Sequence, residues 1–215
     1  MDGMLEVKRM DEIERDVSTE VAIVFVDGYY NELRLISKNK EKLILIFKNS
    51  FVKEVFYVAL MDGNVAGILA CSNNKLRAIH LNKEDIIANL GFIKGNFVFF
   101  LIEKEFHTPI SYDDSTAYIE SVATITEARG KGVATRLLEH VYSKLPYQEF
   151  RLTVKDSNKA AISIYKKLGF KQFDKMKAGF FEKKHFKYKL YMKLVRRNQE
   201  ERSFAYSDFE SESEE

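Results

Sequence analysis

Residues 121–141 read SVATITEARGKGVATRLLEHV, and this stretch combines a strand, a glycine-containing turn and a helix. Residues 121–125 are short, rich in β-branched side chains and uninterrupted by Gly or Pro, which predicts a buried central strand. Gly130 and Gly132 predict a sharp turn that exposes several backbone N–H groups at once. From Val133 onward the apolar residues recur at helical spacing: Ala134, Leu137, Leu138, Val141 and Leu145. The helix is therefore expected to begin directly at the glycines.

The start of that helix has the properties of a phosphate-binding site. A helix N-terminus offers unpaired N–H donors and the positive end of the helix dipole, and here Arg129 and Lys131 add two cations. The pattern Arg129-x-x-Gly132-x-Ala134 after a strand resembles the acyl-CoA pyrophosphate loop of the GNAT superfamily of N-acetyltransferases, written there as Q/R-x-x-G-x-G/A. The alternative is an ordinary glycine turn between a strand and a helix, which the paired cations disfavour.

A second motif follows in the order that this resemblance requires. Residues 158–170 read NKAAISIYKKLGF, a helix that Asn158 would cap and Gly169 would end. The run strongly resembles the second GNAT signature, N-x-x-A-x-x-x-Y-x-x-x-G-F. The resemblance covers residues 55–195 well and residues 1–50 only loosely.

The resemblance implies a single α/β (α+β) domain of the GNAT type. Its mixed, twisted sheet would have six or seven strands, with helices on both faces and a splay at the central strand where the cofactor enters. The residues themselves predict one hairpin, because residues 55–61 and 65–71 are strand-like and are joined by Asp62-Gly63-Asn64. We expect the domain to span residues 1–197 and the acidic residues 198–215 to form a disordered tail.

A helical insertion is expected near residues 82–106, because a structureless connection of this length would be unusual. Asn82 would cap a helix that continues to Phe106 with a break at Gly91 or Gly95. Its buried positions would be Ile86, Ile87, Leu90 and Ile93. An additional core helix is the favoured interpretation, and a lid or a self-association surface is the alternative.

Composition narrows the class of protein. The chain has 215 residues, of which 46% are hydrophobic and 31% charged, and its net charge is +2, which predicts one soluble globular domain. The basic residues 171–197 alternate with apolar ones, so they predict a strand with a solvated face and not a nucleic-acid surface.

The only cysteine, Cys71, is read as a core residue, and the isolated His80 and His107 do not predict a metal site. Because no signal sequence or membrane-spanning run is evident, we expect a cytoplasmic protein without a membrane partner.

The resemblance also implies how a cofactor would be held. Acetyl transfer from acetyl-CoA to an amine requires a bound cofactor, a deprotonated amine and a stabilised thiolate. Val122 and Thr124 would offer backbone groups to the pantetheine arm, and Asn158 would be a further cofactor contact, a helix cap, or both. The pyrophosphate would be held by the glycine loop: Arg129, Gly130, Lys131, Gly132, Val133, Ala134 and Thr135.

Two side chains are predicted to carry the chemistry. Glu120 lies in a strand among apolar neighbours, where it could act as the general base, directly or through water. Pairing with a cation, or a solvated position at the strand end, is an equally supported alternative. Tyr165 matches the family tyrosine whose hydroxyl can donate a proton to the leaving thiolate, although periodicity alone would make it a core residue.

The sequence therefore predicts an acyltransferase, an N-acetyltransferase that uses acetyl-CoA and acts on a primary amine of a small molecule or a protein, without a metal. Its partners would be acetyl-CoA and the amine, with no nucleic acid and a possible homodimer. Two alternatives stay open. One is a non-catalytic acyl-CoA-binding sensor or regulatory module of the same fold, and the other is a protein-interaction module that uses the insertion.

Overall fold

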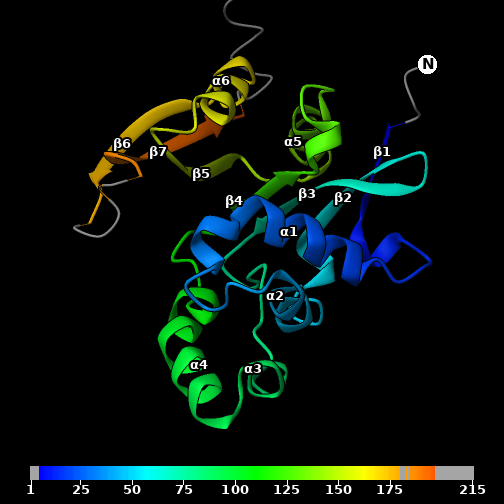
Figure 1. Ribbon diagram of the computed structural model, residues 1–215. Helices are drawn as coiled ribbons and strands as arrows, with labels where there is room; N and C mark the ends of the chain where they lie inside the picture. The colour runs from blue at the N-terminus through cyan, green and yellow to red at the C-terminus, as the bar shows by residue number, and fades with distance from the viewer. Residues whose placement is uncertain (1–4, 180–182, 184, 197–215) are drawn as a thin grey trace, which may run out of the picture.

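The computed structural model describes residues 5–179, 183 and 185–196 (Figure 1). Its helices and strands, in chain order, are β1 (Leu5–Arg9), α1 (Ser18–Leu33), α2 (Lys40–Phe47), β2 (Phe56–Met61), β3 (Asn64–Ser72), α3 (Lys83–Leu90), α4 (Phe92–His107), β4 (Thr116–Thr124), α5 (Val133–Lys144), β5 (Glu149–Lys155), α6 (Lys159–Lys167), β6 (Lys171–Lys177) and β7 (Tyr188–Val195). In these residues no helix is long and apolar enough to cross a membrane. The predicted tail, residues 198–215, lies outside the described part of the chain.

Seven strands form one sheet in the order β1-β2-β3-β4-β5-β7-β6. Every neighbouring pair is antiparallel except β4 and β5, which are parallel. The turn at Asp62 and Gly63 joins β2 to β3, as predicted from the hairpin signal. The expectation of a mixed sheet of six or seven strands is therefore confirmed.

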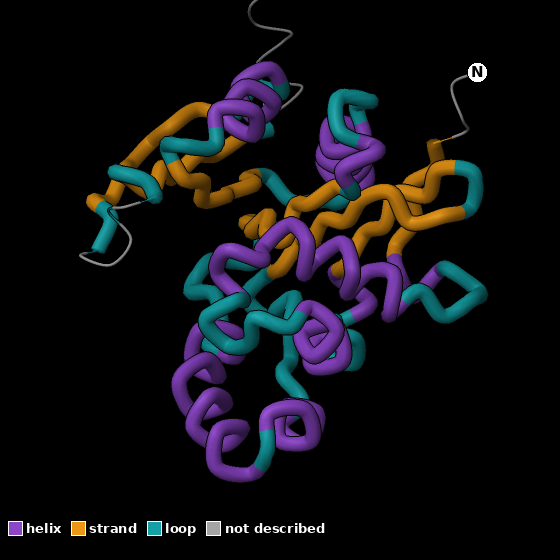
Figure 2. Tube along the Cα trace, viewed as in Figure 1, coloured by secondary structure: helices purple, strands orange, loops and turns teal. Residues whose placement is uncertain are grey.

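Helices cover both faces of this sheet (Figure 2). Alternation along β2 sends Phe56 and Val58 to a cluster shared with α1 and α2, while Tyr57 and Ala59 join a cluster shared with α5 and α6. Cys71 of β3 is buried in the second cluster, which confirms its predicted core position. The sheet thus separates two hydrophobic cores, and α1 and α5 lie on opposite sides of β4.

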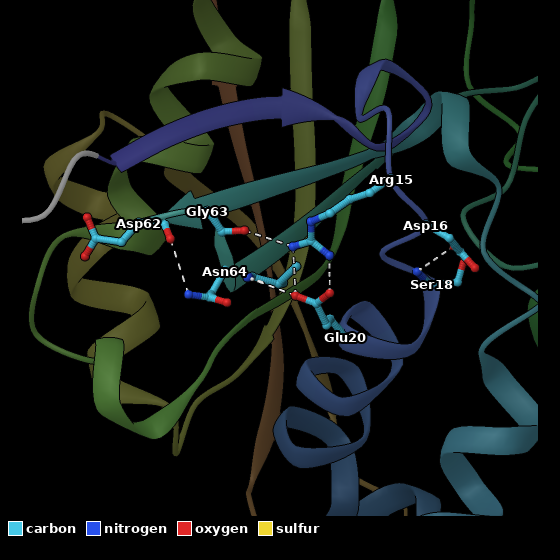
Figure 3. Close-up of polar contacts among 8 residues, drawn as sticks. Arg15, Asp16, Ser18, Glu20, Asp62, Gly63 and Asn64 are labelled. Carbon is cyan, nitrogen blue, oxygen red and sulfur yellow. Dashed lines mark hydrogen bonds and ion pairs between the residues drawn. The ribbon is translucent and has the colours of Figure 1, made fainter.

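A polar network fixes the start of α1 on the β2–β3 hairpin (Figure 3). The Arg15 guanidinium pairs with the Glu20 carboxylate and donates to the carbonyl of Gly63 at 2.9 Å. The backbone N–H of Val65 donates to the same carboxylate at 3.3 Å. Because all partners are exposed or partly exposed, each contact adds little energy, but together they set where α1 enters the fold.

The insertion between β3 and β4 forms two helices instead of one. Asn82 caps α3, since its side-chain oxygen accepts from the N–H groups of Glu84 (2.8 Å) and Asp85 (3.1 Å). The break falls at Gly91 (φ 82°), one of the two positions predicted. The two helices cross closely, because a Cβ at Gly95 would lie 2.7 Å from the Cα of Ile87.

The predicted burial within the insertion is only partly correct. Ile86 is fully buried, as expected, but Ile93 is 85% exposed. The break at Gly91 reorients the chain, so the apolar stripe of α3 does not continue into α4. In α4 the buried face carries Gly95 and Val98, and the opposite face points outward. The interpretation of this helix as core is therefore wrong for its outward face.

Candidate active site

The sheet opens at its centre, between β4 and β5. These parallel strands pair only from Thr116, opposite Glu149, to Ile119, opposite Leu152. In residues 120–124, Glu120, Ala123 and Thr124 pair with β3, and no residue pairs with β5. We call residues 116–119 the closed half of β4 and residues 120–124 the open half. The predicted splay at the central strand lies at this transition (Figure 1).

A β-bulge marks the same transition. Ser121 has φ 56°, which is uncommon for a residue other than glycine, and the pairing with β3 shifts between Ile68 and Ala70. Before the bulge Ile119 belongs to the core cluster on the α5 side, whereas Ala123 belongs to the cluster on the α1 side. Since these positions would share one face of a regular strand, the bulge turns the side chains over. The predicted central strand is therefore present as β4, with a bulge at Ser121 that the sequence did not indicate.

The open half directs backbone polar groups into the split. The N–H of Ile125 donates to the carbonyl of Ala66 at 3.0 Å, so by antiparallel alternation the N–H and C=O of Thr124 point away from β3. The carbonyl of Val122 also faces away, since it accepts a 3.4 Å hydrogen bond from the Tyr29 hydroxyl. Val122 and Thr124, the two residues predicted to meet a pantetheine arm, thus direct backbone groups away from β3.

The glycine loop continues from the open half to α5. Gly130 and Gly132 have φ of 77° and 79°, and a Cβ at either position would meet nothing within 4 Å. The first helical hydrogen bond runs from the N–H of Arg136 to the carbonyl of Gly132. Five N–H groups have no acceptor among the described residues: Gly130, Gly132, Val133, Ala134 and Thr135.

Cations surround these donors. The side chains of Arg129 and Lys131 are exposed and form no ion pair with the part of the chain that the structure describes. The loop therefore combines unpaired donors, a helix N-terminus and uncompensated positive charge, which is the environment that a pyrophosphate requires. Asn158, in contrast, is already engaged, because its side-chain oxygen caps α6 by accepting from the N–H of Ala161 at 3.2 Å. Its amide nitrogen could still meet a ligand.

Tyr165 of α6 lies at the split, in the core cluster beside Phe170, with ring centroids 5.8 Å apart. It is only 7% exposed, and burial raises the pKa of its hydroxyl to about 12. The hydroxyl is therefore protonated at neutral pH. It makes no hydrogen bond to another described residue.

Two further tyrosines accompany Tyr165 and Glu120. Burial raises the pKa of Tyr29, and nearby Tyr165, Glu120 and Tyr118 reinforce this shift. Burial also raises the pKa of Tyr118, with Glu120 again contributing. Residues from α1, β4 and α6 thus meet where the open half begins. Tyr29 was not singled out from the sequence, because it lies outside both motifs and looks like one more apolar position of α1.

Glu120 is paired and not isolated. The Ser72 hydroxyl donates to its carboxylate, and Nη2 of Arg77 lies 3.5 Å from Oε2. The same guanidinium donates to the backbone carbonyls of Glu105 and Thr108 at the end of α4. The cation-paired arrangement, one of the two alternatives, is the one found. No sequence signal identified Arg77, because its contacts depend on tertiary structure alone.

A pocket of about 230 Å³ lies on the other side of Arg77, between residues 73–80 and the end of α4. The imidazoles of His80 and His107 stack there with centroids 4.5 Å apart, and Nε2 of His107 accepts from the N–H of Leu81 at 2.9 Å. Burial lowers the pKa of His107. Among the described residues no group of three or more His, Cys, Asp or Glu could hold a metal ion. The two imidazoles are thus in direct stacking contact.

Comparisons with known proteins agree with this geometry. The model of the acetyltransferase (GNAT) family matches residues 26–170. No curated protein matches the sequence significantly. The fold is similar to that of an N-acetyltransferase from Staphylococcus aureus Mu50 (18% identity, 88% of this chain and 100% of that chain, TM-score 0.55). It is also similar to the ribosomal-protein-S18-alanine N-acetyltransferase from Escherichia coli (14%, 89% and 94%, 0.54) and to the NatC complex bound to Gag peptide and CoA (15%, 90% and 99%, 0.51). At these identities the likeness shows the fold alone.

Proposed function

The chain belongs to the acetyltransferase (GNAT) family, and from this premise we propose that it transfers the acetyl group of acetyl-CoA directly to a primary amine of a small molecule or a protein. The observation that carries the proposal is the open half of β4. This segment connects the ionisable side chains at the bulge to the unpaired N–H groups of the glycine loop. One extended ligand with a thioester at one end and a pyrophosphate further along could contact both the ionisable side chains and the unpaired N–H groups.

In the proposed complex the pyrophosphate lies against residues 129–135 and the pantetheine arm runs along the open half. The backbone groups of Val122 and Thr124 would hydrogen-bond to the arm as a neighbouring strand does. This arrangement places the thioester near the bulge, close to Tyr165. The NatC structure with CoA is a precedent for such a ligand on a similar fold.

In the proposed reaction the neutral amine attacks the thioester carbonyl, so that a C–N bond forms and the C–S bond breaks. Tyr165 donates its proton to the departing sulfur, and the high pKa that burial gives it keeps that proton available at neutral pH. Before the attack Glu120 accepts one proton from the bound ammonium, and the second proton, which the nitrogen loses as the C–N bond forms, restores the Tyr165 hydroxyl. Because Ser72 and Arg77 already hold its carboxylate, we favour transfer through a water molecule.

A second candidate function is a non-catalytic acyl-CoA-binding module. The observation that favours it is the pairing of Glu120 with Arg77, which could make the carboxylate a structural group. This candidate predicts cofactor binding without turnover. The two candidates therefore differ in a measurable result.

The deciding experiment measures acetyl-CoA binding by calorimetry and release of the CoA thiol in the presence of polyamines, amino acids and peptides with free N-termini. A transferase should bind acetyl-CoA and release CoA with at least one amine class. Binding without release for every amine would favour the second candidate, and absence of binding would contradict both. As a control, Gly132→Val should weaken binding, because a β-branched residue is strained at φ 79° and crowds the phosphate site.

A further inference from the structure

The outward face of α4 is an apolar surface without a partner. Measured exposures are 85% for Ile93, 61% for Phe97, 72% for Phe100 and 57% for Leu101. At 100° per residue these side chains occupy an arc of about 100°, which is the width of a face that normally packs against protein. The exposed Lys104 lies in the same arc, about one turn beyond Leu101. Figure 1 shows α4 at the edge of the molecule, with α3 on one side and no other described helix or strand against its outer face.

This helix is firmly held, so its outward face is a defined surface. Gly95 packs against α3, Val98 is buried, and Phe106 contacts Phe47 of α2 with ring centroids 6.2 Å apart. The exposed side chains lie opposite these contacts. They cannot turn into the core without unfolding the insertion.

The exposed area is large enough for a specific interface. From the sizes of these side chains, the face offers about 600 Å² per molecule, at the upper end of the apolar patches found on monomers. Two such faces would bury about 1,200 Å² in total, which reaches the lower limit of specific protein interfaces.

The charges beside the stripe are self-complementary. Lys94 and Glu105 lie on the same flank of the apolar arc, at opposite ends of the helix, and both are exposed. Neither side chain forms an ion pair with another described residue. When two copies of a helix pack antiparallel about a two-fold axis, equivalent flanks face each other. Lys94 of each copy would then lie opposite Glu105 of the other.

We propose that the outward face of α4 binds a second copy of this chain, as an antiparallel helix pair related by a two-fold axis. A membrane surface is the less suitable occupant, because α4 carries Lys94 and Lys104 but also Glu103 and Glu105. Helices that lie on anionic membranes carry an excess of cations on the polar face. This proposal does not depend on the transferase activity.

The dimer also has a structural connection to the candidate active site. Arg77, which contacts Glu120, donates to the carbonyls of Glu105 and Thr108 in the last turn of α4. A second copy that orders this turn would stabilise the position of Arg77. The Arg77 guanidinium thus contacts both the Glu120 carboxylate and the end of the helix that forms the proposed interface.

The test is the mass in solution of the full chain, measured by sedimentation over a range of protein concentrations. The wild type should sediment at twice the 25.0 kDa of one chain. Phe97→Glu and Phe100→Glu should shift the protein to the monomer mass, with dimer affinity lowered more than about 100-fold because a buried unpaired charge is costly. Their circular dichroism and thermal unfolding should show an intact fold. Leu35→Glu, an equally drastic change at an 87% exposed residue outside α4, should leave the dimer unchanged.

Charge reversal tests the two-fold geometry. Lys94→Glu and Glu105→Lys should each weaken the dimer by about 3- to 10-fold, because each interface contains the pair twice. The double reversal should restore the wild-type affinity. A wild-type monomer at about 100 μM, where weak specific dimers assemble, would overturn the proposal. So would a monomer that co-sediments with phosphatidylserine vesicles, since the membrane would then be the occupant.

Discussion

The closed and open halves of β4 have the same neighbour on one side and differ on the other. In the closed half every residue pairs with β5, Tyr118 and Ile119 also pair with β3, and Thr116 and Ala117 are buried. In the open half the edge that faces β5 is unpaired, and the bulge at Ser121 turns the side chains over. Glu120 there contacts Arg77, and the carbonyl of Val122 accepts from the Tyr29 hydroxyl. A strand thus exposes its backbone polar groups where hydrogen bonding to a neighbouring strand is withheld.

The largest expected effect comes from a single hydroxyl at the open half. Tyr165→Phe should lower turnover by about 10²- to 10⁴-fold while acetyl-CoA affinity and stability stay close to wild type, because only the proton donor is removed. Steady-state kinetics and calorimetry measure the two quantities. Since burial raises the pKa of Tyr165 to about 12, wild-type activity should not decline through loss of this proton at any pH well below that value.

The matched control is Tyr57→Phe in β2, which β3 separates from β4. Tyr57 is 5% exposed, and burial raises its pKa to about 12 as well. Its substitution should leave turnover unchanged. If the two variants had the same turnover, Tyr165 would be an ordinary core residue and not a proton donor.

A somewhat smaller effect is expected from the carboxylate. Glu120→Gln preserves shape but cannot accept a proton, so turnover at neutral pH should fall by about 100-fold. The defect should shrink as pH rises toward the pKa of the acceptor amine, about 8 for an α-amine and about 10.4 for a lysine, because more amine is then already neutral. A pH–rate profile measures this.

Glu149→Gln supplies the control from the closed half. Glu149 lies opposite Thr116 and pairs with Arg151 and Lys193, away from the split. This variant should retain the wild-type profile at every pH. An unchanged rate for Glu120→Gln at neutral pH would instead mean that positioning and the amine's own deprotonation suffice.

The smallest expected effect concerns packing behind the bulge. A Cβ at Gly28 of α1 would lie 2.7 Å from the Cβ of Ala123, so the methyl group of Gly28→Ala must displace β4. The free energy of unfolding should fall by about 1 kcal/mol, even though alanine favours helix by 0.5–1 kcal/mol over glycine. Asn31→Ala, at an exposed position of the same helix, should be neutral or stabilising in the same denaturant titration. Equal stabilisation by both would contradict the tight contact.

Local features could be predicted well from the sequence. The helix that begins after Gly132, the cap at Asn82 and the hairpin at Gly63 each depend on residues that are close together in the chain. The outward face of α4 could not be predicted, because a helix that is apolar on all sides has the pattern of a buried one. Only the tertiary position of α4 distinguishes the two.

The candidate site was predicted in part. Both motifs led to the glycine loop, Tyr165 and the splay, since these follow from the resemblance. The bulge gave no signal, because serine rarely adopts φ 56° and its neighbours look like a regular strand. Tyr29, Ser72 and Arg77 were missed for a different reason: they reach the open half of β4 from other elements, and only the folded chain brings them together.

The most direct test of the difference between the two halves is backbone hydrogen exchange with and without acetyl-CoA, resolved by residue in NMR spectra. If the open half and the glycine loop hold the cofactor, the N–H groups of Val122, Thr124, Gly130 and residues 132–135 should become protected on binding. Those of Tyr118 and Ile119, which are already paired with strands on both sides, should not change. Protection that spares the open half, or that appears instead around the pocket beside Arg77, would contradict the proposed cofactor position.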